Sequence, residues 1–268
     1  MVWLIVFIFS SVSTFLINLI HIHSLSIICL QFICLIITGV ILVVLFAELM
    51  GLILYKKDSK VIKPKKIFGF LTFILCEFFC QFLRIKVIIK GKEKIDLNKN
   101  YLFVSNHQSN LDPIILIKAF QELNLTFVMK QELMKIKLIS RYLTASGFYS
   151  INRDNNREGL KTILTTIEAC KCRSVAVFPE GTRSKEGNVI AFRDGIFKVP
   201  QKAGCDLIIC SIDQSRFVKN SFPWRKTKVI IEVCDVIENA TLVSQSTSEI
   251  SENARDLIIK SLEKNREE

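Results

Sequence analysis

The sequence predicts an α/β domain with a largely parallel sheet, preceded by N-terminal membrane helices. Charge is the first observation behind this prediction. Residues 1–47 contain no charged side chain, whereas all 36 basic residues and 24 of the 25 acidic ones lie from Lys56 onward and give that part a net charge of +12. Pattern is the second observation. From Lys86 onward, short β-rich runs alternate with helical stretches, which is typical of parallel strands joined by helices.

The overall composition hides this division. Half of the 268 residues are hydrophobic and the mean hydropathy is +0.37, yet the formal net charge is +11. The apolar content excludes a disordered chain, and 10 Gly with 5 Pro exclude a collagen-like or linker-rich one. Nine cysteines, an odd number without any C-x-x-C spacing, are expected to be reduced thiols rather than a disulfide framework or a zinc site.

Two apolar segments make up the first 54 residues. Val2–Ile20 and Leu25–Leu54 each reach the length of about 20 residues that crosses a bilayer core. The polar turn His21–Ser24 separates them, and six lysines follow within residues 56–66, which places that end in the cytoplasm. We therefore expect residues 1–54 to form a transmembrane helical hairpin. A signal peptide over Val2–Ile20 is the alternative, although a basic leader and a clear cleavage site are lacking.

Residues 55–85 are expected to be a basic linker followed by an interfacial or re-entrant segment. That segment, Ile67–Leu83, is a third apolar run with basic clusters on both sides. If both flanks are cytoplasmic, the run does not cross the membrane and lies in its interface. A third full span is the competing interpretation.

Residues 86–268 are expected to form the α/β domain on the cytoplasmic side. The predicted strands are Lys86–Lys90, Tyr101–Ser105, Thr126–Met129, Val175–Phe178, Leu207–Ile212 and Lys228–Val233. The predicted helices are Pro113–Leu123, Glu132–Leu143, Arg157–Cys170, Asp194–Ala203 and Glu249–Lys264. The last of these helices carries Ile250, Leu257, Ile258 and Leu262 on roughly one face, so we expect it to pack on the domain.

His107 is the only histidine outside the predicted hairpin, and therefore the only side chain that titrates near neutrality in the domain without a large perturbation. It lies in the loop after a predicted strand, where α/β domains place ligand sites. Asp112 follows five residues later, and the two side chains can meet only if the chain reverses at Ser109-Asn110. The carboxylate would then orient the imidazole. Alternatively, His107 is an ordinary loop residue and Asp112-Pro113 is only a helix start with Asp112 as N-cap.

A second polar loop follows the strand predicted at 175–178. It reads Phe178-Pro179-Glu180-Gly181-Thr182-Arg183-Ser184. A glycine allows close backbone approach, the hydroxyls can donate hydrogen bonds, and a guanidinium fits phosphate oxygens. The loop therefore predicts an anion site, and an ordinary charged loop is the alternative. No G-x-S-x-G, G-x-G-x-x-G or P-loop pattern occurs.

The two loops in this order resemble the glycerolipid acyltransferase family, most closely its 1-acyl-glycerol-3-phosphate type. The resemblance covers residues 86–212 and implies a mixed, mostly parallel sheet flanked by helices. It implies that His107 is the general base and that Asp112 orients it. It also implies substrate-binding roles for Asn106, Gln108, Phe178, Pro179, Glu180, Gly181, Thr182 and Arg183. Two further family blocks resemble residues 147–153 and 127–133, and they make Arg153 a phosphate ligand and Lys130 a secondary candidate.

One block departs from the family pattern. Residues 203–210 lack the prolines that usually follow the third motif, which bears on donor and acceptor preference rather than on the chemistry. The implied reaction transfers a fatty acyl group from acyl-ACP or acyl-CoA to the sn-2 hydroxyl of 1-acyl-glycerol-3-phosphate, giving phosphatidate in phospholipid synthesis. Another lysophospholipid or glycerol-3-phosphate is the alternative acceptor. A non-catalytic basic membrane-binding protein is the alternative of a different class.

The implied partners are anionic, as the charge of the domain requires. Lysophosphatidate, membrane lipids and the acyl carrier protein or coenzyme A thioester all carry negative charge and would be attracted to a +12 domain. No metal or redox cofactor is implied. Nucleic acid is not an expected partner, since no binding motif accompanies the basic residues. The expected location is a membrane, with the catalytic domain on the cytoplasmic face. The abundance of Ile, Lys and Asn indicates an AT-rich genome, so this would be a bacterial inner or plasma membrane.

Overall fold

The computed structural model describes residues 10–13, 25–54, 66–130, 142–151, 156–184 and 187–267. The second apolar segment is a single helix, α2 (Leu25–Leu54), and the third is α3 (Lys66–Phe82). Most of Val2–Ile20 lies outside the described residues. Within those residues, no helix meets the length and hydropathy needed to cross a membrane. The predicted transmembrane hairpin is therefore not supported by the structure and stays a prediction.

The domain is a seven-stranded sheet in the order β1-β7-β6-β2-β5-β3-β4, flanked by helices. Its strands are β1 (Ile85–Lys90), β2 (Tyr101–Ser105), β3 (Thr126–Lys130), β4 (Tyr149–Ile151), β5 (Val175–Val177), β6 (Asp206–Asp213) and β7 (Thr227–Ile237). All neighbouring pairs are parallel except β6 and β7. The mixed, mostly parallel sheet is thus confirmed. All six predicted strands are present, and β4 is an addition.

One antiparallel pair decides which strand ends share an edge of the sheet. Because β7 runs opposite to β6, and β1 runs parallel to β7, these two strands point opposite to the other five. The starts of β1 and β7 therefore lie at the same edge as the carboxyl ends of β2, β5 and β6. We call this the carboxyl edge.

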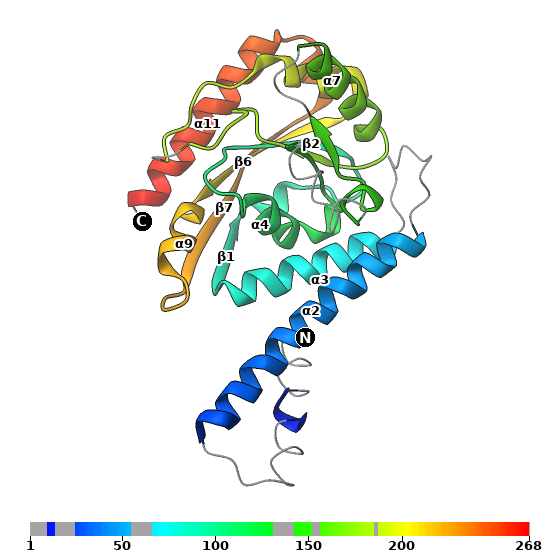
Figure 1. Ribbon diagram of the computed structural model, residues 1–268. Coiled ribbons are helices and arrows are strands. Elements are labelled where there is room, and N and C mark those ends of the chain that lie inside the picture. The colour runs from blue at the N-terminus through cyan, green and yellow to red at the C-terminus, as the bar shows by residue number, and fades with distance from the viewer. Residues whose placement is uncertain are drawn as a thin grey trace.

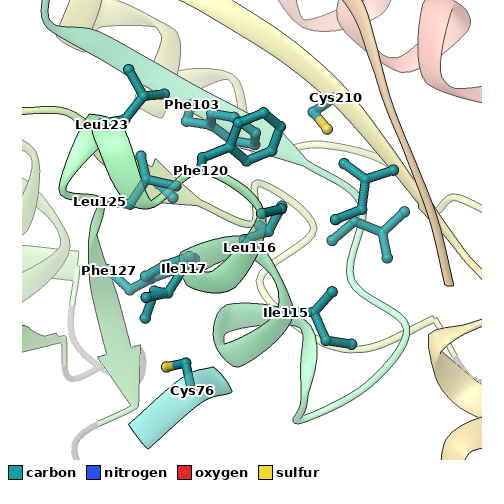
Figure 2. Packing of buried hydrophobic residues seen from close by; sticks show 14 of the residues in the cluster. Cys76, Phe103, Ile115, Leu116, Ile117, Phe120, Leu123, Leu125, Phe127 and Cys210 are labelled. Carbon is teal, nitrogen blue, oxygen red and sulfur yellow. The ribbon is translucent and has the colours of Figure 1, made fainter. Parts of the chain in front are cut away.

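Helices cover both faces of the sheet (Figure 1), and each face packs a cluster of buried apolar side chains. On one face, α3 and α4 (Asp112–Ala119) pack on the strands, and Phe103 lies against Phe120 with ring centroids 5.0 Å apart (Figure 2). The other face is covered by α7 (Asn156–Cys170), α8 (Lys198–Ala203), α10 (Asn239–Val243) and α11 (Thr247–Glu267). The predicted docking of the last helix is confirmed, with Ile250, Ile258 and Leu262 buried.

Short helical turns complete the chain. The predicted helix 113–123 divides into α4 and a 3₁₀ turn at Gln121–Leu123, and the predicted helix 194–203 begins with a 3₁₀ turn, Asp194–Phe197, before α8. Further 3₁₀ turns span Lys92–Lys94 and Ser215–Phe217, and α9 (Val218–Ser221) follows the latter. Residues 132–141 of the predicted helix 132–143 lie outside the described residues.

Candidate functional site

The two polar loops predicted to carry chemistry lie side by side at the carboxyl edge. They follow β2 and β5, which are adjacent parallel strands. Three hydrogen bonds join them through the backbone of His107. Its N–H donates to Oε1 of Glu180 at 2.8 Å, and its carbonyl accepts from the N–H (2.8 Å) and the hydroxyl (3.0 Å) of Ser184. The loops therefore form one hydrogen-bonded unit.

Asp112 turns back onto His107, as the reversal at Ser109-Asn110 predicts. Nδ1 of His107 lies 2.9 Å from Oδ2 of Asp112. The same oxygen accepts the backbone N–H groups of Gln108 (2.7 Å) and Ser109 (2.8 Å). Asp112 is the first residue of α4, whose N-cap is Leu111, so its carboxylate does not cap the helix. The alternative of a plain N-cap aspartate is wrong.

This arrangement leaves one imidazole nitrogen for a reaction. Oδ2 of a carboxylate only accepts, so Nδ1 must carry a proton and the neutral ring keeps the Nε2 lone pair. The ring stacks on Phe178 at a centroid distance of 4.1 Å and an angle of 13°, which fixes its plane. Its side chain is 15% exposed while that of Asp112 is fully buried. The group that can meet a substrate is therefore the imidazole and not the carboxylate.

Glu180 is a buried carboxyl that supports the loop of His107. Its pKa is raised to about 7, mainly by burial and to a smaller extent by the charge of Asp112, while the backbone N–H groups of His107 and Ile190 and the charge of Arg255 oppose the rise. Its Oε1 is occupied by the N–H of His107. Its Oε2 is buried and has no hydrogen-bond partner among the described residues. Glu180 therefore supports the loop of His107, and its contact with an acceptor stays a prediction.

Asn106 and Gln108 flank the histidine but differ in their contacts. Asn106 is fully buried. Its Nδ2 donates to the carbonyl of Ile212 at 2.9 Å, and its Oδ1 accepts the backbone N–H of Ile212 at 2.8 Å. It ties β2 to β6, which does not fit the predicted substrate contact. Gln108 is 6% exposed, and neither polar atom of its side chain has a hydrogen-bond partner in the described part of the chain. Since unpaired buried amides are costly, Gln108 stays a candidate for contacting a ligand.

The outer part of the second loop faces solvent. Gly181 has φ +70°, and a Cβ there would lie 2.9 Å from Nε of Arg193, so a side chain would be strained. The carbonyl of Pro179 accepts the N–H of Arg193 at 3.0 Å, which ties the second loop to the segment before α8. Thr182 and Arg183 are exposed and can meet an anionic substrate.

The remaining predicted residues are placed only in part. Lys130 is the last residue of β3, two strands from β2, and only its backbone is described. Arg153 lies outside the described residues. Ser184 is not among the predicted site residues, although the structure bonds it to the carbonyl of His107. The hydroxyl at the end of the motif is the sequence signal that could have indicated this role. Phe178 is expected to bind substrate, and the structure places it against the imidazole ring.

The chain is similar to several known acyltransferases. The chain is 28% identical over 182 residues to the 1-acyl-sn-glycerol-3-phosphate acyltransferase of Borreliella burgdorferi, covering 67% of this chain and 72% of that protein. It is 35% identical to the probable enzyme of that name from Mycoplasma genitalium, over 47% of this chain and 48% of that one. The fold matches the crystal structure of the acyltransferase for 1-acyl-sn-glycerophosphate from Thermotoga maritima, with a TM-score of 0.64, 20% identity, and coverage of 84% and 95% of the two chains.

The family assignment rests on the segment that carries both loops. Residues 86–213 match the model of the family described as Acyltransferase. This segment runs from β1 to the end of β6 and includes His107, Asp112 and the whole of the second loop. Residues 86–213 therefore form a domain that matches the acyltransferase family.

Proposed function

We propose that this protein transfers a fatty acyl group from an acyl thioester to the sn-2 hydroxyl of 1-acyl-glycerol-3-phosphate, giving phosphatidate. The observation that carries the proposal is the pairing of His107 with the buried Asp112, beside a loop that presents Thr182 and Arg183 to solvent. The names of the relatives from Borreliella burgdorferi and Mycoplasma genitalium support the same acceptor.

In the proposed reaction, His107 acts first as a base and then as an acid. Nε2 takes the proton from the acceptor hydroxyl, whose oxygen attacks the thioester carbonyl and forms a tetrahedral intermediate. The intermediate collapses, the C–S bond breaks, and the leaving thiolate takes the proton from the imidazolium. The products are the ester and a free thiol. Asp112 stabilises the imidazolium between these steps, because its carboxylate lies 2.9 Å from Nδ1.

The acceptor phosphate would bind at the outer part of the second loop. Arg183 offers a planar fork for phosphate oxygens, and Thr182 offers a hydroxyl. The side-chain amide of Gln108, which follows His107 and has no partner in the described part of the chain, suits a glycerol hydroxyl. Lys130 and Arg153 are proposed as further phosphate contacts on the strength of the family resemblance.

The donor is proposed to be acyl-ACP or acyl-CoA. Both are anionic thioesters, and the +12 charge of residues 56–268 favours their approach. The steps above transfer protons and an acyl group only, so we propose a reaction without metal or redox cofactor.

We also propose that the enzyme works at a membrane, with its domain on the cytoplasmic face. The support is an apolar surface on the first helices. Large apolar side chains are exposed along α2 and α3, namely Leu30, Ile33, Ile37, Ile41, Leu42, Leu45, Phe46, Leu49, Ile67 and Phe70. Contiguous exposed apolar surface of this kind is typical of membrane or protein contact, and the lysines of residues 56–66 favour an anionic lipid surface.

The test is an acyl-transfer assay with the full chain in membranes, comparing wild type with His107→Ala. We expect turnover to be lost in His107→Ala and kept in the matched variant His23→Ala. Equal turnover by wild type and His107→Ala would exclude the base assignment. The acceptor is tested in the same assay. Lysophosphatidate should be used in preference to lysophosphatidylcholine and glycerol-3-phosphate, and preference for either of these would exclude the proposed acceptor.

A further inference from the structure

An exposed tryptophan marks a surface that the acyl-transfer chemistry does not use. The loop between α9 and β7 carries Phe222-Pro223-Trp224-Arg225-Lys226. Trp224 is 85% exposed, the highest value among the large apolar side chains of the described residues. Exposing an indole to water is unfavourable, so a side chain of this size on a loop tip points to a contact outside the chain.

This loop packs against the end of α3. The rings of Phe82 and Phe222 lie 5.3 Å apart, and the N–H of Thr227 donates to the carbonyl of Arg84 at 3.1 Å. Phe79 and Phe82 on α3 are also exposed, at 39% and 43%. We call the group formed by Phe79, Phe82, Phe222 and Trp224 the aromatic surface. In Figure 1 the loop after α9 and the junction of α3 with β1 lie near each other at the lower left of the α/β domain, above α2.

The loop segment that carries Phe222 and Trp224 is rich in cations and contains no acidic residue, and Glu77 on α3 is paired with Lys118 at 3.0 Å. Residues 214–231 contain no Asp or Glu and five basic residues, which are Arg216, Lys219, Arg225, Lys226 and Lys228. Lys219, Arg225 and Lys226 are exposed, and the structure gives them no ion pair within its described residues. Positive charge around an exposed aromatic group complements an anionic, partly apolar partner.

The aromatic surface lies at the edge of the sheet that holds the catalytic loops. Thr227 at the start of β7 is level with Ile85 at the start of β1, and Ile230 is paired with Asp213 at the end of β6. The end of β6 is in turn beside the end of β2, which leads into His107. A partner bound at Trp224 therefore faces the same edge as His107 and Arg183.

We infer that the aromatic surface is a second membrane contact, in addition to α2, and that its partner is the surface of a bilayer containing anionic phospholipid. Indole rings are enriched at the level of the lipid headgroups, and Lys and Arg next to them attract anionic lipid. The contact turns the carboxyl edge toward the bilayer, so an acceptor lipid reaches His107 without leaving the membrane. This last consequence rests on the proposed function, whereas the contact itself does not.

The experiment uses fluorescence, because the chain contains only Trp3 and Trp224. The full-length Trp3→Phe variant is bound to vesicles of phosphatidylcholine and phosphatidylglycerol, and flotation verifies that it is bound. The probe is a phosphatidylcholine brominated on its acyl chains. We expect the emission of Trp224 to shift to shorter wavelength and to be quenched by the brominated lipid. The inference would be overturned if the protein binds vesicles but Trp224 keeps the emission wavelength of an exposed tryptophan and is not quenched.

A matched control places the probe at the opposite edge. Val243 is exposed at the end of α10, which follows the carboxyl end of β7 near the start of β6. In the triple variant Trp3→Phe, Trp224→Phe, Val243→Trp, quenching should be several times weaker than for Trp224. Equal quenching at both edges would also overturn the inference, since the domain would then have no fixed orientation.

Two further measurements distinguish an anionic lipid partner from a neutral lipid or a protein. In the Trp3→Phe background, Arg225→Ser with Lys226→Ser should reduce the quenching of Trp224, and quenching unchanged by this double variant would count against an anionic lipid partner. A shift of Trp224 emission caused by acyl carrier protein without vesicles would assign the surface to a protein partner and overturn the inference. The fluorescence does not depend on turnover, so His107→Ala in the same background should be quenched equally. Failure of the proposed function thus leaves this test intact.

Discussion

Changing Asp112 to Asn tests whether the negative charge of the carboxylate stabilises the imidazolium of His107. Oδ2 accepts all three hydrogen bonds, so the amide oxygen of Asn takes its place and still accepts the N–H groups of His107, Gln108 and Ser109. The NH₂ group then takes the place of Oδ1, which is buried and has no hydrogen-bond partner among the described residues. The ring keeps its tautomer, but no negative charge faces the imidazolium that forms when Nε2 takes the proton.

The expected loss is large in catalysis and small in stability. Two opposite unit charges about 4 Å apart near a protein surface attract by about 4 kcal/mol, so loss of the carboxylate charge should lower kcat by up to about 10³-fold. Oδ2 accepts three hydrogen bonds of 2.7 to 2.9 Å. Weakening charge-assisted bonds to neutral ones costs about 1–3 kcal/mol, which is less than the typical stability of a domain of about 5–15 kcal/mol. The variant should therefore fold.

The assay is steady-state acyl transfer at varied acceptor concentration, with thermal unfolding measured on the same preparation. We expect kcat to fall and KM to stay close to wild type. Asp206→Asn is the matched control, because Asp206 is also buried and accepts two hydrogen bonds, from Lys99 and Asn239, at the opposite edge of the sheet. A folded Asp112→Asn protein that keeps a tenth or more of wild-type kcat would refute the reasoning.

Three more variants test the surrounding groups. Because burial raises the pKa of Glu180 to about 7, folding favours the protonated form of its carboxyl. The contribution of Glu180 to the free energy of unfolding therefore falls as pH rises from about 4.5 to 7. Glu180→Gln should remove up to about 3 kcal/mol of this pH dependence, measured by denaturant titrations at several pH values. Arg183→Ala should raise KM for a phosphate-bearing acceptor about tenfold with little change in kcat, and an unchanged concentration dependence would refute the phosphate role. Asn106→Ala should lower the free energy of unfolding by about 2–4 kcal/mol, because it leaves both backbone groups of Ile212 unpaired; a value near zero would show that the bridge is unimportant.

Much of the fold follows from local pattern, because each long strand is an apolar run that ends in a polar loop. β4 was not predicted, since its three residues include Ser150 and carry no alternation. The predicted helix over 194–203 begins as a 3₁₀ turn, and Pro200 lies inside α8, where it lacks a backbone N–H to donate. Short or irregular elements of this kind depend on tertiary contacts that periodicity does not report.

The candidate site divides in the same way. The meeting of His107 and Asp112 was predictable because five residues and a turn separate them. The contacts of Asn106 and Glu180 were not, because Ile212 and the backbone N–H of His107 lie 106 and 73 residues away in sequence. A motif shows which residue types gather in a loop, and only the folded chain shows which of them face the substrate.

The three hydrogen bonds between the backbone of His107 and the second loop have a consequence for how acceptor preference can change. A substitution at Glu180 or Ser184 alters the anchor of the base as well as the loop. Thr182 and Arg183 are exposed and take no part in these three bonds. Variation in these two outward positions can therefore adapt the chain to a new headgroup at little risk to turnover, which makes them the natural starting points for redesign of specificity.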